Sequence, residues 1–256
     1  METIIQLTAS NIAAEHICCA FSDKKCAAGY QAKKEWLLQQ FDEGYVFKKF
    51  DIRGKVFIEY VPAEKAWVPI DAPGYMLINC FWVSGQYKDK GFGKALLQEC
   101  LKDAEGMKGI AVVSSAKKQP FLSDKQFFIK NGFKKCDEAA PWFELYYLPL
   151  TDDAPAPGFK ACAKNATSDV KAGLSVYYTN ACPFTEFYVK ELEQIAKQRQ
   201  LPITIVPLST REQAQNHFIP HTIYSVFYQG KFVTQNILNE NYFAKFVQPL
   251  LERKGG

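Results

Sequence analysis

The residues best suited to do chemistry together lie in a segment of the first half of the chain that is rich in glycine and lysine. An apolar stretch ending at Val83 leads into a loop, and Gly91 and Gly93 follow where a helix is expected to begin. Glycine lets the backbone approach a ligand closely, because no Cβ stands in the way. Unpaired N–H groups at a helix start and the helix dipole both favour an anion. The segment therefore predicts a pyrophosphate-binding loop, with added positive charge from Lys88, Lys90 and Lys94.

The spacing of this loop excludes two familiar phosphate-binding patterns. The Walker pattern GxxxxGK[ST] is absent, and the residues after Gly93 do not fit the dinucleotide pattern GxGxxG. A strand–helix turn with lysines is also common as a plain solvated turn. The loop by itself therefore does not identify its ligand.

A second chemical feature is a cysteine in the C-terminal part of the chain. The segment Val176–Glu186 joins an expected strand to an expected helix, and Cys182 falls where that helix would begin. The positive end of the helix dipole lowers the pKa of a thiol placed there. Thr185, one turn on, could donate a hydrogen bond to the sulfur. We therefore predict a reactive thiol at Cys182, and the alternative is a thiol that only packs.

Composition and charge indicate an ordinary globular protein. The chain has 256 residues, of which 48% are hydrophobic and 23% charged, enough for one large or two small domains. Its net charge of +4 is shared equally between residues 1–150 and 151–256, which disfavours nucleic acid as the main partner. The longest mainly apolar stretch, Tyr75–Val83, is too short to span a bilayer. With no recognisable secretory signal, we expect a cytoplasmic protein that does not bind membranes.

The cysteines and histidines do not form a metal-binding or disulfide pattern. Eight cysteines and three histidines are present, and no two cysteines have the CxxC spacing. We therefore expect no metal site, and we interpret the cysteines as reduced thiols, most of them buried.

The elements that position the glycine loop form an expected first domain, residues 1–150, with the order β-α-α-β-β-β-α-β-α-β-β. Hydrophobic periodicity predicts its helices at residues 11–20, 28–41, 91–104 and 123–131. Apolar and alternating runs predict its strands at residues 3–7, 45–51, 55–61, 76–83, 109–114, 133–136 and 142–148. The strand at 76–83 is strongly apolar and is expected to be central.

A change of composition after Leu150 separates a second domain from the first. Residues 151–170 contain Pro155, Pro157 and Gly158 without clear periodicity, so we predict a linker there. The second domain, residues 171–256, has the expected order β-α-β-α-β-β-α. Its strands are predicted at 174–178, 203–207, 222–228 and 231–234. Its helices are predicted at 184–200 and 239–251, with a short helix between them that starts at a capping box formed by Ser209 and Glu212.

The glycine loop resembles the acetyl-CoA loop of the GNAT (GCN5-related N-acetyltransferase) superfamily, whose pattern is [R/Q]-x-x-G-x-[G/A]. The pattern falls on six successive residues, with lysine at the first position: Lys88, Asp89, Lys90, Gly91, Phe92 and Gly93. A second similarity is the segment KQFFIKNGF at Lys125–Phe133, an aromatic helix that ends in Gly-Phe. The expected order of elements over residues 3–148 also agrees.

The resemblance implies a fold, a cosubstrate and an activity. The fold would be α/β (α+β), a mixed sheet with flanking helices, and the activity would be acetyl transfer from acetyl-CoA to an amine of a small molecule or peptide. The strand before the loop would splay from its neighbour at 109–114. Pantetheine would pair with the backbone of Phe81, Trp82 and Val83, and the pyrophosphate would meet N–H groups from Lys88 to Lys94. Phe128 would line the cavity near the thioester.

The sequence departs from the family pattern at two catalytic positions. Many members have a proton-donating Tyr where this chain has Phe128, and a Glu on the strand before the loop, which here contains no acid. Tyr87 or the pair Ser114–Ser115 could replace the proton donor, and Glu59 could act as a base through water. The same departures leave open a domain that binds acetyl-CoA without efficient transfer.

The second domain resembles the thioredoxin/glutaredoxin fold, with the C-x-x-C motif reduced to C-x-x-T at Cys182–Thr185. Internal disulfide chemistry is then excluded, and a monothiol redox protein acting through Cys182 is a third hypothesis. Pro220 precedes the third strand, near the place of the cis-proline of that fold. A GNAT domain followed by this module is similar to the bacterial acetyltransferases that carry a YoaP-like C-terminal domain.

Overall fold

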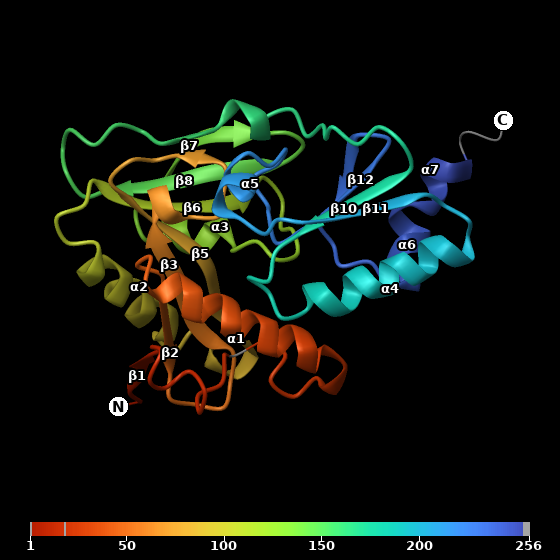
Figure 1. Cartoon of the computed structure of the whole chain (residues 1–256). Helices are drawn as coiled ribbons and strands as arrows, with labels where there is room; N and C mark the ends of the chain where they lie inside the picture. Colours follow the sequence, from red (N-terminus) through yellow and green to blue (C-terminus); the bar gives the residue numbers. More distant parts are fainter. Residues whose placement is uncertain (1, 18, 253–256) are drawn as a thin grey trace.

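The computed structural model describes residues 2–17 and 19–252, and Figure 1 shows the whole chain. The larger sheet has seven strands in the order β1-β2-β3-β5-β6-β8-β7. Neighbouring strands are antiparallel except β5 and β6, which are parallel, so the sheet is mixed as predicted. The strands are β1 (Ile4–Gln6), β2 (Val46–Phe50), β3 (Val56–Pro62), β5 (Tyr75–Val83), β6 (Gly109–Ser115), β7 (Lys134–Ala139) and β8 (Phe143–Pro149).

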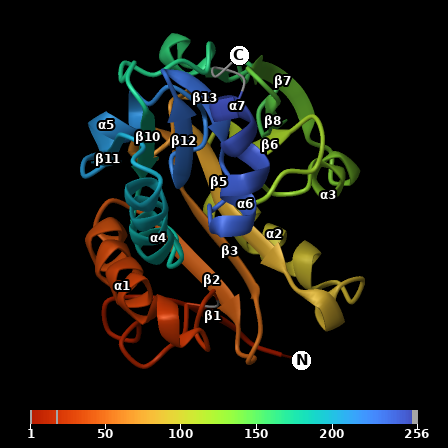
Figure 2. The same cartoon turned by 90° about the vertical axis from the view of Figure 1, so that its right-hand side faces the viewer.

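Helices cover both faces of this sheet (Figure 2). On one face lies α1 (Ala27–Phe41), which buries Trp36 and Leu37 in one hydrophobic cluster. On the other face lie α2 (Phe92–Asp103) and α3 (Lys125–Lys130), whose apolar residues belong to a second cluster. Four short 3-10 helices complete this description: Lys24–Cys26, Ala63–Lys65, Gly85–Tyr87 and Ala161–Ala163.

The helix predicted at residues 11–20 is wrong: the described residues of that segment form turns. The side chain of Asn11 accepts a hydrogen bond from the backbone N–H of Thr8 and donates one to the carbonyl of Gln6. Such local side-chain bonds give the backbone an alternative to a helix. Ile12 and Ile17 are nevertheless buried, so the apolar spacing reflects burial of a coil rather than a helix face.

The second sheet has four strands in the order β11-β10-β12-β13, and its helices follow the predicted order. The strands are β10 (Leu174–Tyr178), β11 (Ile203–Pro207), β12 (Tyr224–Tyr228) and β13 (Lys231–Thr234). The helices are α4 (Thr185–Gln198), α5 (Arg211–Gln215), α6 (Glu240–Phe246) and α7 (Gln248–Glu252), so the predicted last helix is divided at Val247. The capping box uses Thr210 and Gln213 rather than Ser209 and Glu212.

The segment predicted as a linker is held along the first sheet. Its short strand β9 (Gly158–Phe159) pairs with β4 (Ile70–Asp71). The backbone N–H of Lys160 donates to the carbonyl of Pro69 at 3.0 Å, and Lys164 forms an ion pair with Asp137 at 2.8 Å. The two sheets are therefore joined by a fixed connection.

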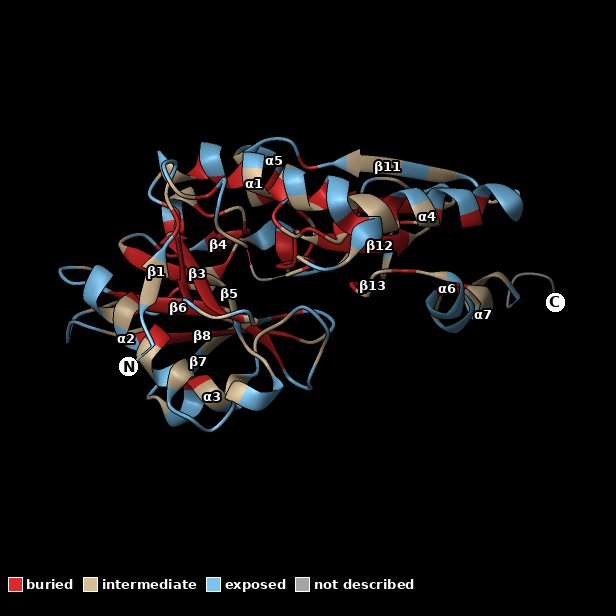
Figure 3. Cartoon of the chain, turned by 90° about the horizontal axis from the view of Figure 1, so that it is seen from below, coloured by how far each residue is buried: buried red, intermediate tan, exposed pale blue. Residues whose placement is uncertain are grey.

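The two sheets share one hydrophobic cluster, and Figure 3 shows buried residues running along the strands and the inward faces of α1 and α4. The ring of Phe232 on β13 lies 5.6 Å from that of Trp142 beside β8. Helices α1 and α4 lie side by side in Figures 1 and 2, and a Cβ on Gly29 of α1 would lie 2.3 Å from the carbonyl oxygen of Pro183. A larger residue at position 29 would push the two halves apart. Within the described residues, no helix has the length and apolar character to cross a membrane.

Candidate active site

Strands β5 and β6 separate halfway along their length. They pair from Tyr75–Gly109 to Ile78–Val112 and no further. Beyond that point β5 stays paired with β3 as far as Val83, and β6 stays paired with β8 as far as Ser115. The edge of β5 that faces β6 therefore leaves its backbone groups free from Asn79 to Val83. This gap includes Phe81, Trp82 and Val83, the residues expected to meet pantetheine.

A β-bulge lies at the apex of this gap. Glu59 of β3 is opposite Cys80 and Tyr60 is opposite Ile78, so Asn79 has no partner on β3. A bulge re-aims a side chain within an otherwise regular strand. Here it directs Asn79 toward the α1 face, where its Nδ2 donates to the hydroxyl of Tyr45 at 2.9 Å.

The glycine loop ends in an open helix N-terminus. Gly91 is the N-cap of α2 with φ of 83°, a left-handed conformation that favours glycine, and no side chain caps the helix there. The first N–H groups of the helix, from Phe92 to Lys94, therefore have no helical partner. The backbone N–H of Lys88 already donates to the carbonyl of Gly85 at 3.1 Å, so the free donors begin after Lys88. The side chains of Lys88, Lys90 and Lys94 are exposed, as is that of Asp89.

The two glycines of the loop have different roles. A Cβ on Gly91 would meet no atom within 4 Å, so that position is open to a ligand. A Cβ on Gly93 would lie 3.1 Å from the ring of Phe127 and 3.2 Å from that of Phe81. Gly93 is therefore required by the packing of α2 against aromatic rings. Phe92, which lies between the two glycines, packs edge-on against Phe50.

Phe128 is fully buried beneath the open part of β5. Its ring packs edge-on against Phe81 at 5.7 Å and against Phe133 at 5.1 Å between centroids. It has no group that could donate a proton. Its contact with Phe81 places it behind the strand that borders the gap.

The predicted substitutes for the missing proton donor are engaged elsewhere. Tyr87 packs on Phe92 and against Gly54, which lies at the β2–β3 turn. Gly54 is five residues from Glu59, roughly 16 Å along an extended chain. The structure therefore does not bring Tyr87 and Glu59 together. The hydroxyls of Ser114 and Ser115 donate to the backbone carbonyls of Ser123 and Lys117, each at 2.7 Å.

Glu59, expected as a base that acts through water, is buried and paired. It is 0% exposed, its Oε1 accepts from Lys33 Nζ at 2.5 Å, and its Oε2 accepts from the hydroxyl of Tyr45 at 2.6 Å. Burial by itself would lower the pKa of Lys33, but the adjacent Glu59 carboxylate raises the pKa above its ordinary value. One carboxylate oxygen of Glu59 is thus paired with a cation and the other with a hydroxyl, so the buried charge is balanced without water.

The expected lowering of the Cys182 pKa is wrong. Helix α4 begins three residues later, at Thr185, and burial raises the pKa of Cys182 to about 12 despite a hydrogen bond from the backbone of Phe184. The hydroxyl of Thr185 donates to the carbonyls of Thr179 and Cys182, not to the sulfur. Among the described residues the cis peptide bond is Ala140–Pro141, so Pro220 is not a cis-proline. This geometry does not favour monothiol chemistry at Cys182.

Alkylation of the native protein with iodoacetamide at pH 8 is expected to modify Cys162 well before Cys182. Cys162 is exposed, whereas the raised pKa of Cys182 leaves little thiolate, so its labelling should be roughly a hundredfold slower than that of an ordinary thiol. Peptide mass spectrometry gives both rates, and labelling in urea is the control in which the two should become similar. Rapid native labelling of Cys182 would contradict the assignment.

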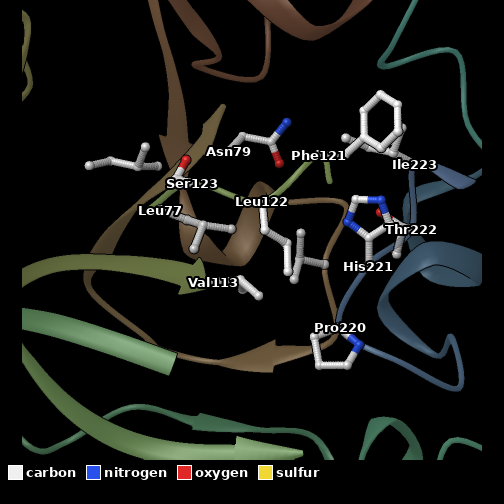
Figure 4. A pocket seen from close by; sticks show the side chains of 12 residues that line it. Leu77, Asn79, Val113, Phe121, Leu122, Ser123, Pro220, His221, Thr222 and Ile223 are labelled. Carbon is white, nitrogen blue, oxygen red and sulfur yellow. The ribbon is translucent and has the colours of Figure 1, made fainter. Parts of the chain in front are cut away.

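A pocket that the sequence did not indicate lies at the apex of the gap (Figure 4). Leu77 and Asn79 come from β5 and Val113 from β6, and the other walls are the loop at 121–123 and the segment 220–223 before β12. His221, on that last segment, is 4% exposed and its Nε2 has no hydrogen-bond partner. No local motif in Pro220-His221-Thr222 indicates this position, because it depends on how the two sheets are joined.

Two family models and a full-length relative identify the chain. A model described as the acetyltransferase (GNAT) family matches residues 11–133, and a model described as YoaP-like matches residues 202–245. The "Uncharacterized N-acetyltransferase YoaP" of Bacillus subtilis (strain 168) is 44% identical over 248 residues, which cover 96% of this chain and 98% of that protein. The chain belongs to the GNAT acetyltransferase family. It is an acetyl-CoA-dependent N-acetyltransferase whose C-terminal part is YoaP-like.

Two solved structures of similar proteins match this chain over their whole length. A putative acetyltransferase of the GNAT family from Desulfovibrio desulfuricans is 16% identical, with 59% of this chain and 100% of that chain covered and a TM-score of 0.43. An acetyltransferase of the GNAT family from Staphylococcus aureus Mu50 is 17% identical, with the same coverage and a TM-score of 0.42.

Proposed function

We propose that acetyl-CoA lies in the gap between β5 and β6, with its acetyl group at the apex. The observation that carries this proposal is the end of β5–β6 pairing at Ile78–Val112 while β5 remains paired on its other side. An extended ligand chain with amide groups can pair with such an edge as an added strand would. Pantetheine has this form, and the free backbone of Phe81–Val83 is the edge it would use.

The pyrophosphate of acetyl-CoA would occupy the open N-terminus of α2. The unpaired N–H groups at Phe92–Lys94 and the positive end of the helix dipole both favour an anion there. The exposed Lys88, Lys90 and Lys94 add charge around the same place. Gly91 contributes a turn without a Cβ, so the phosphates can approach the backbone.

The reaction we propose is direct transfer from the thioester to a neutral amine. The amine nitrogen attacks the carbonyl carbon, a C–N bond forms, the C–S bond breaks, and the nitrogen gives up one proton. Phe128 cannot protonate the leaving sulfur, and the hydroxyls of Ser114 and Ser115 already donate elsewhere. Coenzyme A therefore leaves as its thiolate, and holding the two reactants together supplies much of the rate.

The acceptor in this proposal is an amine of a small molecule or a peptide, in the cytoplasm. Each of the seven cysteines that the structure describes is free. Free thiols in this number are typical of a reducing compartment.

Acetyl-CoA is expected to raise the melting temperature, because a ligand that binds only the native state adds about 2.7 kcal/mol of stability at a hundred times its Kd. In Gly91→Ala the shift should be lost or at least tenfold more ligand should be needed, since the left-handed N-cap is strained by a Cβ. Gly106→Ala is the matched control. Its φ of 81° is nearly the same as the 83° of Gly91, and a Cβ there also meets no atom within 4 Å, but it follows the far end of α2.

Differential scanning fluorimetry with increasing acetyl-CoA measures these shifts. No shift in the parent protein at millimolar acetyl-CoA, or equal loss in both variants, would contradict the site. Transfer is then read as free thiol released from acetyl-CoA with polyamines, amino acids and peptides. Binding of acetyl-CoA without thiol release in the presence of any of these amines would contradict the proposed acceptor class.

A further inference from the structure

The pocket at the apex of the gap is built jointly by the two sheets. On one side are Asn79 of β5 and Val113 of β6, where pairing between these strands has just ended. On the other side is His221, from the segment that leads into β12 of the second sheet. Figure 4 shows Asn79 and His221 reaching toward the same pocket from these different elements. A thioester carbonyl placed at the apex would therefore face residues of the C-terminal part.

Hydrogen bonds hold two walls of the pocket in place. The hydroxyl of Thr222, the neighbour of His221, donates to the carbonyl of Trp67 at 2.6 Å. Farther along the chain, the side chain of Gln235 accepts from Trp142 Nε1 and donates to the carbonyl of Pro120, both at 3.1 Å. The second contact holds the loop that forms another wall of the pocket. The pocket is thus an ordered part of the junction between the sheets.

Two polar groups in the pocket could accept a hydrogen bond, and one of them has no partner among the described residues. The Nε2 of His221 is buried and makes no hydrogen bond, which costs free energy unless a ligand or water completes it. Asn79 donates from its Nδ2 to the hydroxyl of Tyr45, and its Oδ1 is the acceptor end of the same amide. Both groups can accept a hydrogen bond from an N–H. A primary amine supplies such N–H groups.

We propose that this pocket receives the acceptor amine and that His221 accepts its proton during acetyl transfer. The inference rests on the proposed function, because it needs the thioester at the apex of the gap. As the C–N bond forms and the C–S bond breaks, the proton lost by the nitrogen passes to the imidazole of His221 while coenzyme A leaves as its thiolate. The imidazolium, which no carboxylate of the pocket balances, then gives this proton to the thiolate. The C-terminal part would then complete the active site rather than act as a separate module.

The lining of the pocket also indicates the class of amine. It contains no carboxylate to balance an ammonium ion, and burial lowers the pKa of His221 to about 4, so the imidazole is neutral near pH 7. The cavity measures about 30 Å³, room for about two water molecules. Apart from Asn79, Ser123, His221 and Thr222 its lining is apolar. The acceptor it fits is a primary amine of low basicity on a slender, uncharged stem.

Bromoacetyl-CoA tests the position of His221 without knowledge of the natural acceptor. Its electrophilic carbon occupies the place of the acetyl methyl, and a neutral imidazole nearby displaces bromide and becomes alkylated. We expect His221 to be the alkylated residue in peptide mass spectra, with loss of this product when excess acetyl-CoA is present. Alkylation of Cys80 or another residue instead, or no alkylation in a protein that binds acetyl-CoA, would overturn the proposal.

Kinetics with His221→Gln test its role, with propargylamine as a slender, weakly basic probe and propylamine as its more basic counterpart. We expect the parent to prefer propargylamine near neutral pH, and His221→Gln to lose at least a hundredfold in kcat while its melting-temperature shift with acetyl-CoA is kept. The control is His217→Gln, at a buried histidine that bonds Ser225 and does not line the pocket. Unchanged kcat in His221→Gln, or equal loss in both variants, would overturn the proposal. Failure of the parent to bind acetyl-CoA would instead remove the proposed function itself.

Discussion

Replacing Lys33 by Met is expected to lower the free energy of unfolding by about 3–5 kcal/mol, because it leaves the buried carboxylate of Glu59 without its cation. The ion pair joins α1 to β3, and the side chains of its two residues are 3% and 0% exposed. Tyr45 would still donate to Glu59, but one hydrogen bond does not replace the charge. Urea denaturation followed by circular dichroism measures the change.

The double variant Lys33→Met/Glu59→Gln is the informative comparison. It removes both charges and keeps an oxygen to accept from Tyr45, so most of the lost stability should return. As a control, Lys190→Met breaks an exposed pair with Glu186 and should cost less than about 1 kcal/mol. If the double variant is as unstable as the single one, the pair is not what destabilises Lys33→Met. If the stable double variant also retains acetyl transfer, Glu59 is not the catalytic base.

Lowering the pH from 7 to 5 is expected to remove about 4 kcal/mol of unfolding free energy through two buried histidines. Burial lowers the pKa of His217 to about 3, with His221 nearby adding to the effect, and burial lowers the pKa of His221 to about 4. The unfolded chain protonates both near the ordinary pKa of 6.5, so below that pH it binds more protons than the native state. This contribution to stability is complete above pH 6.5, and it is lost as the pH falls toward about 4 for His221 and about 3 for His217.

Urea midpoints at pH 7, 6 and 5 measure this dependence. Paired carboxylates lose their contribution only below their ordinary pKa of about 4, so the range from 6.5 to 5 reports mainly on histidine. The third histidine, His16, also has a lowered pKa from burial and acts in the same direction. His217→Gln and His221→Gln should each remove about half of the part of the slope that these two histidines supply. A stability that is flat between pH 6.5 and 5 would show that these histidines are not buried and neutral.

The part of the site made from local backbone could be predicted from the sequence. Gly91 takes the left-handed conformation that an open helix start requires. Gln229 and Gly230, between the strands predicted at 222–228 and 231–234, both have a positive φ and turn the chain from β12 to β13. The apolar run at 76–83 forms the central β5, which ends in the expected loop. These features depend on steric limits and periodicity within a few residues, which the order of side chains determines by itself.

Burial and pairing across long sequence separations could be decided only by the tertiary structure. The sequence suggests Glu59 as a base that acts through water, but α1 brings Lys33 to it and pairs its charge. The sequence predicts a reactive thiol at Cys182, but packing removes the solvent that a thiolate needs. His221 carries no local signal, and it lies at the apex of the gap because the second sheet docks on the first. The sequence by itself therefore determined which elements form and where an anion can bind, through short-range sterics. Which charges are desolvated, and which side chains meet at the reacting centre, followed only from the contact between the two sheets, because desolvation and proximity are properties of the assembled fold.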